Sequence, residues 1–312
     1  MLNKNFQGWL NRNDKKNTID NFLKSLENLD NAKLVKIDTQ DSEDGSIHLY
    51  NEFSHEIKSY KNLLYFRLFD LGSSLLPIIE KKNYSTAILI CRSIFETILI
   101  FMFRMIRISD RIENKNWKSL YIEILNFKFN PSWKEDGDID WNKVFPHIKK
   151  FHINDAIRAF SKNMDTGKGK RVEDLLFKDY TIMSDIAHPN QANRSLYLNT
   201  RDNLNEETGI NKRRRHNFSV NHADNIVFPL IVKIIEMFLI LDKQVSDVVN
   251  ESLTKLEGFR MDVEIYQKNN FIDDLNEIQP FLMDEMNELK KQDMRPKELV
   301  DQLVKASFKK NG

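Results

Sequence analysis

Two segments of the chain carry polar side chains at positions where the surrounding pattern is apolar. In the first, Arg92-Ser-Ile-Phe-Glu96, an arginine and a glutamate lie four residues apart inside the most apolar stretch of the chain. Residues at this spacing lie one turn apart on the same face of a helix. If that face is fully buried, removing one partner would cost about 3–5 kcal/mol. We therefore expect Arg92 and Glu96 to pair with each other or with a partner on another helix.

The second segment, Tyr180 to Asn190, has the spacing of an acid–base site. Tyr180, Ser184 and His188 follow one another at intervals of four residues, and Pro189 comes next. On a helix these three side chains share one face, and the proline ends the helix directly after the histidine. The unperturbed pKa of histidine, about 6.5, suits proton transfer near neutral pH.

Together these segments predict one polar site between two packed helices. In a catalytic role, His188 would transfer protons and Arg92 would stabilise the charge that develops on phosphorus, with Glu96 and Tyr180 beside them. In a structural role, the same residues would form a buried network that fixes the register of the two helices. Exposure distinguishes the two, because an active site needs His188 within reach of solvent.

A third feature is the basic run Lys212, Arg213, Arg214 and Arg215, which His216 follows. Such a run contacts nucleic acid or forms a solvated patch. The nearly neutral chain, with 47 Lys+Arg against 46 Asp+Glu and a net charge of +1, does not suit a protein that coats nucleic acid with its whole surface.

Motifs of metal and nucleotide enzymes do not occur in the sequence. There is no phosphate-binding P-loop, no G-x-S-x-G turn and no H-E-x-x-H helix, and these are the patterns that such enzymes carry. The acidic run Asp136–Asp140 has Trp141 and His147 where a calcium loop needs glycine and glutamate. The single cysteine, Cys91, lies in an apolar run and reads as a core residue. We predict no metal and no cofactor.

The elements that position these residues follow from composition. The 312 residues include only 9 glycines and 7 prolines, with 41% hydrophobic and 30% charged residues. Few turn formers predict few turns and long helices, so the expected fold is all-α. Apolar residues at helical spacing predict helices over 52–79, 84–109, 116–129, 141–161 and 173–188, and one from Asn221 or Asp224 past Leu253. Two β-like pieces, 195–199 and 217–220, predict a small hairpin insertion near 195–220.

The domain organisation we expect is a helical bundle with two helical appendages. Residues 1–50 form an N-terminal arm. Its helix spans 18–34, and Thr18 would be the N-cap. Residues 51–256 form the bundle, and residues 257–312 form the C-terminal extension. The apolar excess of the helix after Asn221 predicts a homodimer. No signal peptide and no run of about 18 uninterrupted apolar residues is visible, which predicts a cytoplasmic protein without a membrane span.

The two polar helices together resemble a known family. A helix of the form A-x-x-x-x-R-S-x-F-E, here Ala87 to Glu96, is followed by Y-x-x-x-S-x-x-x-H-P, here Tyr180 to Pro189. This resembles a group of bacterial helical proteins whose bundle is similar to the HEPN superfamily of defence-associated and toxin ribonucleases. The resemblance covers residues 50–255. It implies a homodimeric helical bundle, a polar site where the two helices meet, and metal-independent cleavage of RNA.

The sequence departs from that superfamily in its R-x4–6-H motif. No arginine lies four to six residues before His188, and the pair that fits the spacing runs from Arg215 to His222. Three readings therefore remain. The first is an RNA-directed ribonuclease, with His188 or His222 as acid–base group. The second is a non-catalytic module that binds a protein partner, and the third is a sensor that binds a small ligand between the two helices.

Overall fold

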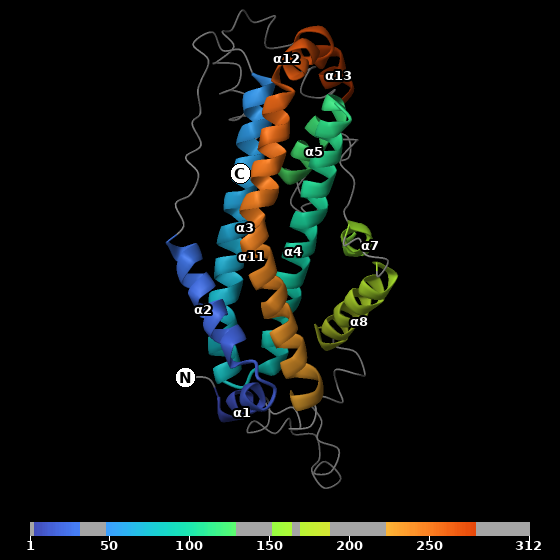
Figure 1. The fold of residues 1–312 in the computed structure, drawn as a ribbon. Coiled ribbons are helices and arrows are strands. Elements are labelled where there is room, and N and C mark those ends of the chain that lie inside the picture. Colours follow the sequence, from blue (N-terminus) through green and yellow to red (C-terminus); the bar gives the residue numbers. More distant parts are fainter. Residues whose placement is uncertain (1–2, 32–47, 129–151, 164–168, 188–222, 279–312) are drawn as a thin grey trace, which may run out of the picture. The chain divides into compact units, whose positions relative to one another are not determined.

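The computed structural model describes residues 3–31, 48–128, 152–163, 169–187 and 223–278. Every regular element in these ranges is a helix and none is a strand, which confirms the all-α prediction (Figure 1). The predicted hairpin near 195–220 and the C-terminal residues after 278 lie outside the described ranges. So does the first part, 141–151, of the helix predicted over 141–161.

Three long helices form the framework: α3 (Leu49–Glu80), α4 (Tyr84–Glu113) and α11 (Phe228–Gly258). Only one proline and one glycine lie inside α3, at Pro77 and Gly72. The turn between α3 and α4 is short, and Lys82 adopts a left-handed conformation there with φ of 57°. A five-residue π-helix, η2 (Ala223–Val227), leads directly into α11. The predicted start of this helix, Asn221 or Asp224, is therefore within two residues of the observed one.

The described residues form two compact units, and each of the three long helices contributes to both. Unit 1 takes in Met1–Leu34, Lys61–Phe103 and His152–Asp247, and unit 2 takes in Val35–Tyr60, Arg104–Phe151 and Val248–Gly312. Besides parts of the long helices, unit 1 contains α1 (Lys4–Arg12), α2 (Lys16–Asp30), α7 (Ile153–Asn163) and α8 (Gly169–Ala187). Unit 2 contains α5 (Trp117–Lys128), α12 (Arg260–Asn269) and α13 (Phe271–Ile278).

The two N-terminal helices contribute to the core of unit 1, which the expectation of a peripheral arm did not anticipate. Phe6 of α1 and Phe22 of α2 are both 0% exposed. Their rings lie 5.0 Å and 4.9 Å from those of Phe228 and Phe238 on α11. The predicted cap Thr18 is wrong, because α2 begins two residues earlier, after Lys15, and shows no side-chain cap.

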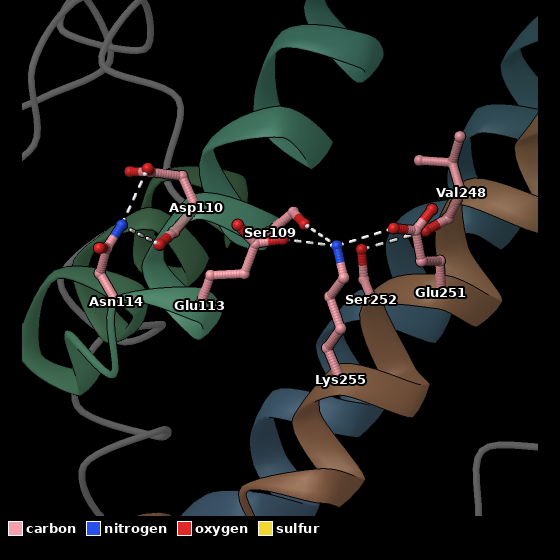
Figure 2. A network of polar contacts seen from close by, with 8 residues as sticks. All are labelled: Ser109, Asp110, Glu113, Asn114, Val248, Glu251, Ser252 and Lys255. Carbon is pink, nitrogen blue, oxygen red and sulfur yellow. Dashed lines mark hydrogen bonds and ion pairs between the residues drawn. The ribbon is translucent and has the colours of Figure 1, made fainter.

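In unit 2, a lysine on α11 joins that helix to α4. Lys255 Nζ donates to Ser109 Oγ at 3.1 Å, to Glu113 Oε1 at 2.6 Å and to Glu251 at 2.7 Å (Figure 2). These bonds raise the pKa of Lys255, and the hydrogen bond from Lys255 lowers the pKa of Glu113. Near neutral pH, Lys255 is therefore protonated and Glu113 is ionised.

The apolar helix α4 lies in the core along much of its length. Cys91, Phe95, Leu99 and Ile108 are each 0% exposed. Among the described helices, α4 is the one that is long and apolar enough to cross a membrane, with a mean hydropathy of 1.9 over 18 residues. Buried core helices can have the same length and hydropathy, so these values do not separate a membrane-spanning helix from a core helix.

The stripe on α11 that predicted a dimer is mostly covered within one chain. Leu230, Ile234, Leu241 and Val245 are 5% exposed or less, whereas Ile226 is 39% exposed. Packing inside unit 1 thus accounts for much of the apolar surface of this helix. The homodimer stays a prediction.

Candidate functional site

The predicted meeting of the two polar segments is present in unit 1. Arg92 of α4 donates from Nε to Glu96 Oε1 at 2.8 Å and from Nη2 to the Tyr180 hydroxyl at 3.1 Å. The guanidinium carbon of Arg92 lies 5.2 Å from the centroid of the Tyr180 ring. Arg92 therefore makes both a hydrogen bond and a cation–π contact with α8, and it joins the two segments that the sequence singled out.

Apolar packing beneath these polar contacts positions α8. The rings of Phe95 and Tyr180 are stacked, with centroids 6.1 Å apart and planes 19° from parallel. Phe95 and Met183 are 0% exposed, and Ile186 is 6% exposed. Because Tyr180, Met183 and Ser184 follow at intervals of three and four residues, α8 presents polar and apolar groups to unit 1 along neighbouring faces.

The Arg92–Glu96 pair is only partly buried. The Arg92 side chain is 23% exposed and the Glu96 side chain 31% exposed, so full burial, the condition for the largest energetic cost, is not met. Burial acts to lower the pKa of Arg92, but the hydrogen bonds and charges of Glu96 and Tyr180 outweigh it and the net direction is upward. The site thus holds a permanent cation that a solute can reach.

A second charged contact, which was not predicted from the sequence, attaches α8 to α11. Lys233 of α11 forms an ion pair with Asp179, which directly precedes Tyr180. The Asp179 side chain is 13% exposed. The available signal was Lys233 itself, a charge within an apolar run, but its partner depends on how α8 packs. Arg92 and Lys233 therefore tie consecutive residues of α8 to two different helices.

Ser184, the next residue on the Tyr180 face, has a buried hydroxyl. Its Oγ has no hydrogen-bond partner among the described residues. Burying a hydroxyl without a hydrogen-bond partner costs about 1–3 kcal/mol of stability. A ligand or a water molecule that forms a hydrogen bond with the Ser184 hydroxyl would remove this cost.

Several predicted site residues lie outside the described ranges. They are His188, Lys212, Arg213, Arg214, Arg215 and the alternative histidine, His222. In the sequence, His188 directly follows Ala187, the last residue of α8. The contacts of Arg92, Glu96 and Tyr180 are thus described, and those of the histidine and the basic run stay predictions.

The described residues contain no group of three or more His, Cys, Asp or Glu side chains that could hold a metal ion. Two carboxylates beside the site, Glu96 on α4 and Asp179 next to Tyr180, are each paired with a cation. What the arrangement offers chemically is a fixed guanidinium, a phenol and an unsatisfied hydroxyl.

Comparisons of this chain with models of protein families, with curated proteins and with solved structures find no match.

Proposed function

We propose that this protein is an RNA-directed, metal-independent ribonuclease of HEPN-like character, of the defence or toxin type, and that its active site lies around Arg92 and Tyr180. The observation that carries the proposal is the contact between the Arg92 guanidinium and the Tyr180 hydroxyl, 3.1 Å long. This contact joins the two segments that resemble the family. It also places a partly exposed cation against the helix that His188 follows in the sequence.

The proposed reaction needs the chain, its RNA substrate and water. The 2′-hydroxyl of a nucleotide attacks the adjacent phosphorus, the bond from phosphorus to the 5′-oxygen breaks, and a 2′,3′-cyclic phosphate forms. His188 accepts the proton of the 2′-hydroxyl as general base, and the departing 5′-oxygen is protonated from a second protonated group or from water. Arg92 stabilises the charge that develops on the phosphate oxygens.

Glu96 and Tyr180 hold the Arg92 guanidinium in a fixed orientation. Glu96 accepts from Nε and Tyr180 accepts from Nη2, so these two hydrogen bonds occupy two of the five N–H donors of the guanidinium. A guanidinium held in this way loses less entropy when it binds a phosphate than a mobile one does. We therefore assign Glu96 and Tyr180 as positioning residues.

The experiment is cleavage of single-stranded RNA in the presence of a chelator. The wild type and His188→Ala are compared, with His222→Ala as the variant at the alternative histidine and His55→Ala as a matched control on α3. We expect cleavage by the wild type and by both control variants, and its loss in His188→Ala while circular dichroism shows an unchanged fold. Absence of cleavage by the wild type, or equal cleavage by His188→Ala, contradicts the proposal.

A second candidate function is a non-catalytic interaction module, which two exposed apolar side chains favour. Leu63 and Phe66, three residues apart on α3, are 61% and 53% exposed. Residues at this spacing share one face of a helix. As occupant we propose a second copy of this chain. Sedimentation would then show a dimer for the wild type and a monomer for Phe66→Lys. Because the ribonuclease proposal also implies a homodimer, this candidate further requires that the wild type does not cleave RNA. A wild-type monomer at tens of micromolar, or RNA cleavage that His188→Ala abolishes, contradicts it.

A further inference from the structure

Three lysines of unit 1 lie where the turn between α3 and α4 meets α1, and none of the sites above uses them. Asn3 Nδ2 donates to the carbonyl oxygen of Ile79 at 2.6 Å, and the backbone N–H of Lys82 donates to the same oxygen at 3.0 Å. The residue before α1 and the turn after α3 thus share one acceptor. This places Lys4, which follows Asn3, at the same corner of unit 1 as Lys81 and Lys82. We call these three lysines the basic corner.

The basic corner is open to solvent and carries excess positive charge. Its three residues are exposed, and their ammonium groups make no hydrogen bond, ion pair or ring contact with any residue that the structure describes. One carboxylate, Glu80, precedes Lys81 in the chain and has an interaction of its own. Asp224 of η2 is already paired with Arg12 of α1. Even with Glu80 counted in full, the corner sets three positive charges against one negative charge.

The turn between α4 and α5 is built in the same way as the turn of the basic corner. Lys82 and Lys115 both adopt the left-handed conformation, with φ of 57° and 51°. In each turn the N–H of the lysine donates to the carbonyl oxygen three residues earlier. The N–H of the next residue, Asn83 or Asn116, donates to the carbonyl oxygen five residues earlier. Many helices end in this way, and glycine is the usual residue at the left-handed position.

The side chains of these two lysines differ in their contacts. Lys115 Nζ lies 2.9 Å from Asp262 Oδ2 and 4.9 Å from the centroid of the Phe259 ring, so this side chain stabilises unit 2. Lys82 has no such contact among the described residues. A side chain is unfavourable at a left-handed position where glycine is not. Lys82 therefore destabilises its turn without a contact that compensates, which favours a role toward a ligand.

We propose that the basic corner binds the phosphate backbone of the single-stranded RNA that the Arg92 site cleaves. The inference rests on the proposed function and adds a second contact to its substrate. An ammonium group is a compact charge with three donors, which suits phosphate oxygens. Arg92 lies eight residues after Tyr84, the first residue of α4, which is a rise of roughly 12 Å along the helix. Nucleotides on one side of the cleaved bond can therefore reach the turn that precedes α4.

An anionic membrane is another surface that attracts lysines, but the basic corner lacks the apolar side chains that suit a membrane. Helices that lie on membranes combine basic residues with large exposed apolar ones. The large apolar side chains of α1 are Phe6, Trp9 and Leu10, and all three are buried. The turn itself, residues 81–83, has none. The observations thus favour RNA as the ligand, and a membrane is one outcome of the test.

The experiment measures binding of the full chain to a fluorescent 2′-O-methyl RNA oligonucleotide by anisotropy, at several salt concentrations. Lys82→Gly is the main variant, because it removes the charge and gives the left-handed position its favoured residue. Lys115→Gly is the matched control at the equivalent position of the other turn. Lys4→Gln is a second variant, which tests the basic corner from α1. Thermal unfolding checks the fold, and Lys82→Gly should melt at or above the temperature of the wild type.

At about 50 mM salt we expect Lys82→Gly and Lys4→Gln each to bind about eightfold more weakly, with a slope of log K against log salt that is shallower by roughly 0.7, the values for one lost contact to a single strand. Lys115→Gly and Lys82→Arg should bind as the wild type does. The inference is overturned if the wild type does not bind, or if Lys82→Gly and Lys115→Gly bind alike. It is also overturned if vesicles of equal parts phosphatidylcholine and phosphatidylserine bind the wild type more tightly than the oligonucleotide does, because the ligand would then be a membrane.

The 2′-O-methyl strand separates this inference from the proposed function, because it has no 2′-hydroxyl that can attack phosphorus. Cleavage of unmodified RNA is measured beside binding. Binding that depends on Lys82, in a protein that does not cleave RNA, contradicts the proposed function and leaves the binding site standing. Cleavage by a protein whose binding does not depend on Lys82 overturns the inference alone.

Discussion

Replacement of Glu96 by alanine tests the energetic reading of the Arg92 site. The substitution removes the carboxylate that accepts from Arg92 Nε at 2.8 Å and leaves Arg92 with its Tyr180 contact. Exposed pairs at this spacing contribute about 0.3–0.5 kcal/mol, and breaking a fully buried pair costs about 3–5 kcal/mol. With side chains 23% and 31% exposed, the Arg92–Glu96 pair lies between these limits. We expect a loss of about 1–2 kcal/mol in the free energy of unfolding.

The assay is thermal and urea unfolding of Glu96→Ala beside Glu264→Ala. The control removes the carboxylate of another pair at the same spacing, Arg260–Glu264, whose side chains are 52% and 46% exposed. We expect the melting temperature to fall by about 1.5–3 °C for Glu96→Ala and by about 1 °C or less for the control. Equal losses in the two variants would refute the reasoning, as would a loss above about 3 kcal/mol, the range of a fully buried pair.

Three further predictions concern burial and charge. Phe95→Ala should cost about 3–5 kcal/mol in urea unfolding, since the ring is fully buried against Tyr180; a loss below about 1 kcal/mol would contradict this packing. Cys91 is 0% exposed, and burial raises the pKa of its thiol, so it should react with a thiol reagent only after denaturation. Rapid reaction in the native protein would contradict its placement in the core. Because folding lowers the pKa of Glu113, its bond to Lys255 stabilises the protein above the unfolded pKa of about 4.3 and is lost as pH falls through the folded value. The difference in melting temperature between wild type and Lys255→Met should therefore shrink from pH 6 to pH 3, and a constant difference would argue against the network.

The helices could be predicted from the sequence because apolar periodicity is a local signal. Scarce glycine and proline predicted long helices, and α4 and α5 lie where the pattern placed them, although α4 continues four residues beyond the predicted end at Ser109. The start of α2 was misjudged, since Thr18 is a good N-cap by residue type, yet the helix begins at Lys16. Residue type alone does not settle a boundary when neighbouring turns compete.

The candidate site was predictable only in part. Arg92 and Glu96 drew attention because charges in an apolar helix need partners, and their contact with Tyr180 follows from that requirement. The Lys233–Asp179 pair and the ion pair between Arg107 and Glu123 could not be assigned in this way. Their partners lie on other helices, and tertiary packing decides which side chains of two helices meet. The partial exposure of Arg92 also depends on packing, not on periodicity.

The most direct test of the proposed active site is the single-turnover rate of RNA cleavage by Arg92→Gln in the presence of a chelator. Removing one fixed donor to a developing oxyanion lowers rates by about 10²–10³-fold. Arg260→Gln, with a guanidinium that two glutamates already pair, serves as the control. The account predicts a rate at least about 100-fold lower for a folded Arg92→Gln variant and an unchanged rate for Arg260→Gln. Cleavage by Arg92→Gln at the wild-type rate would contradict it.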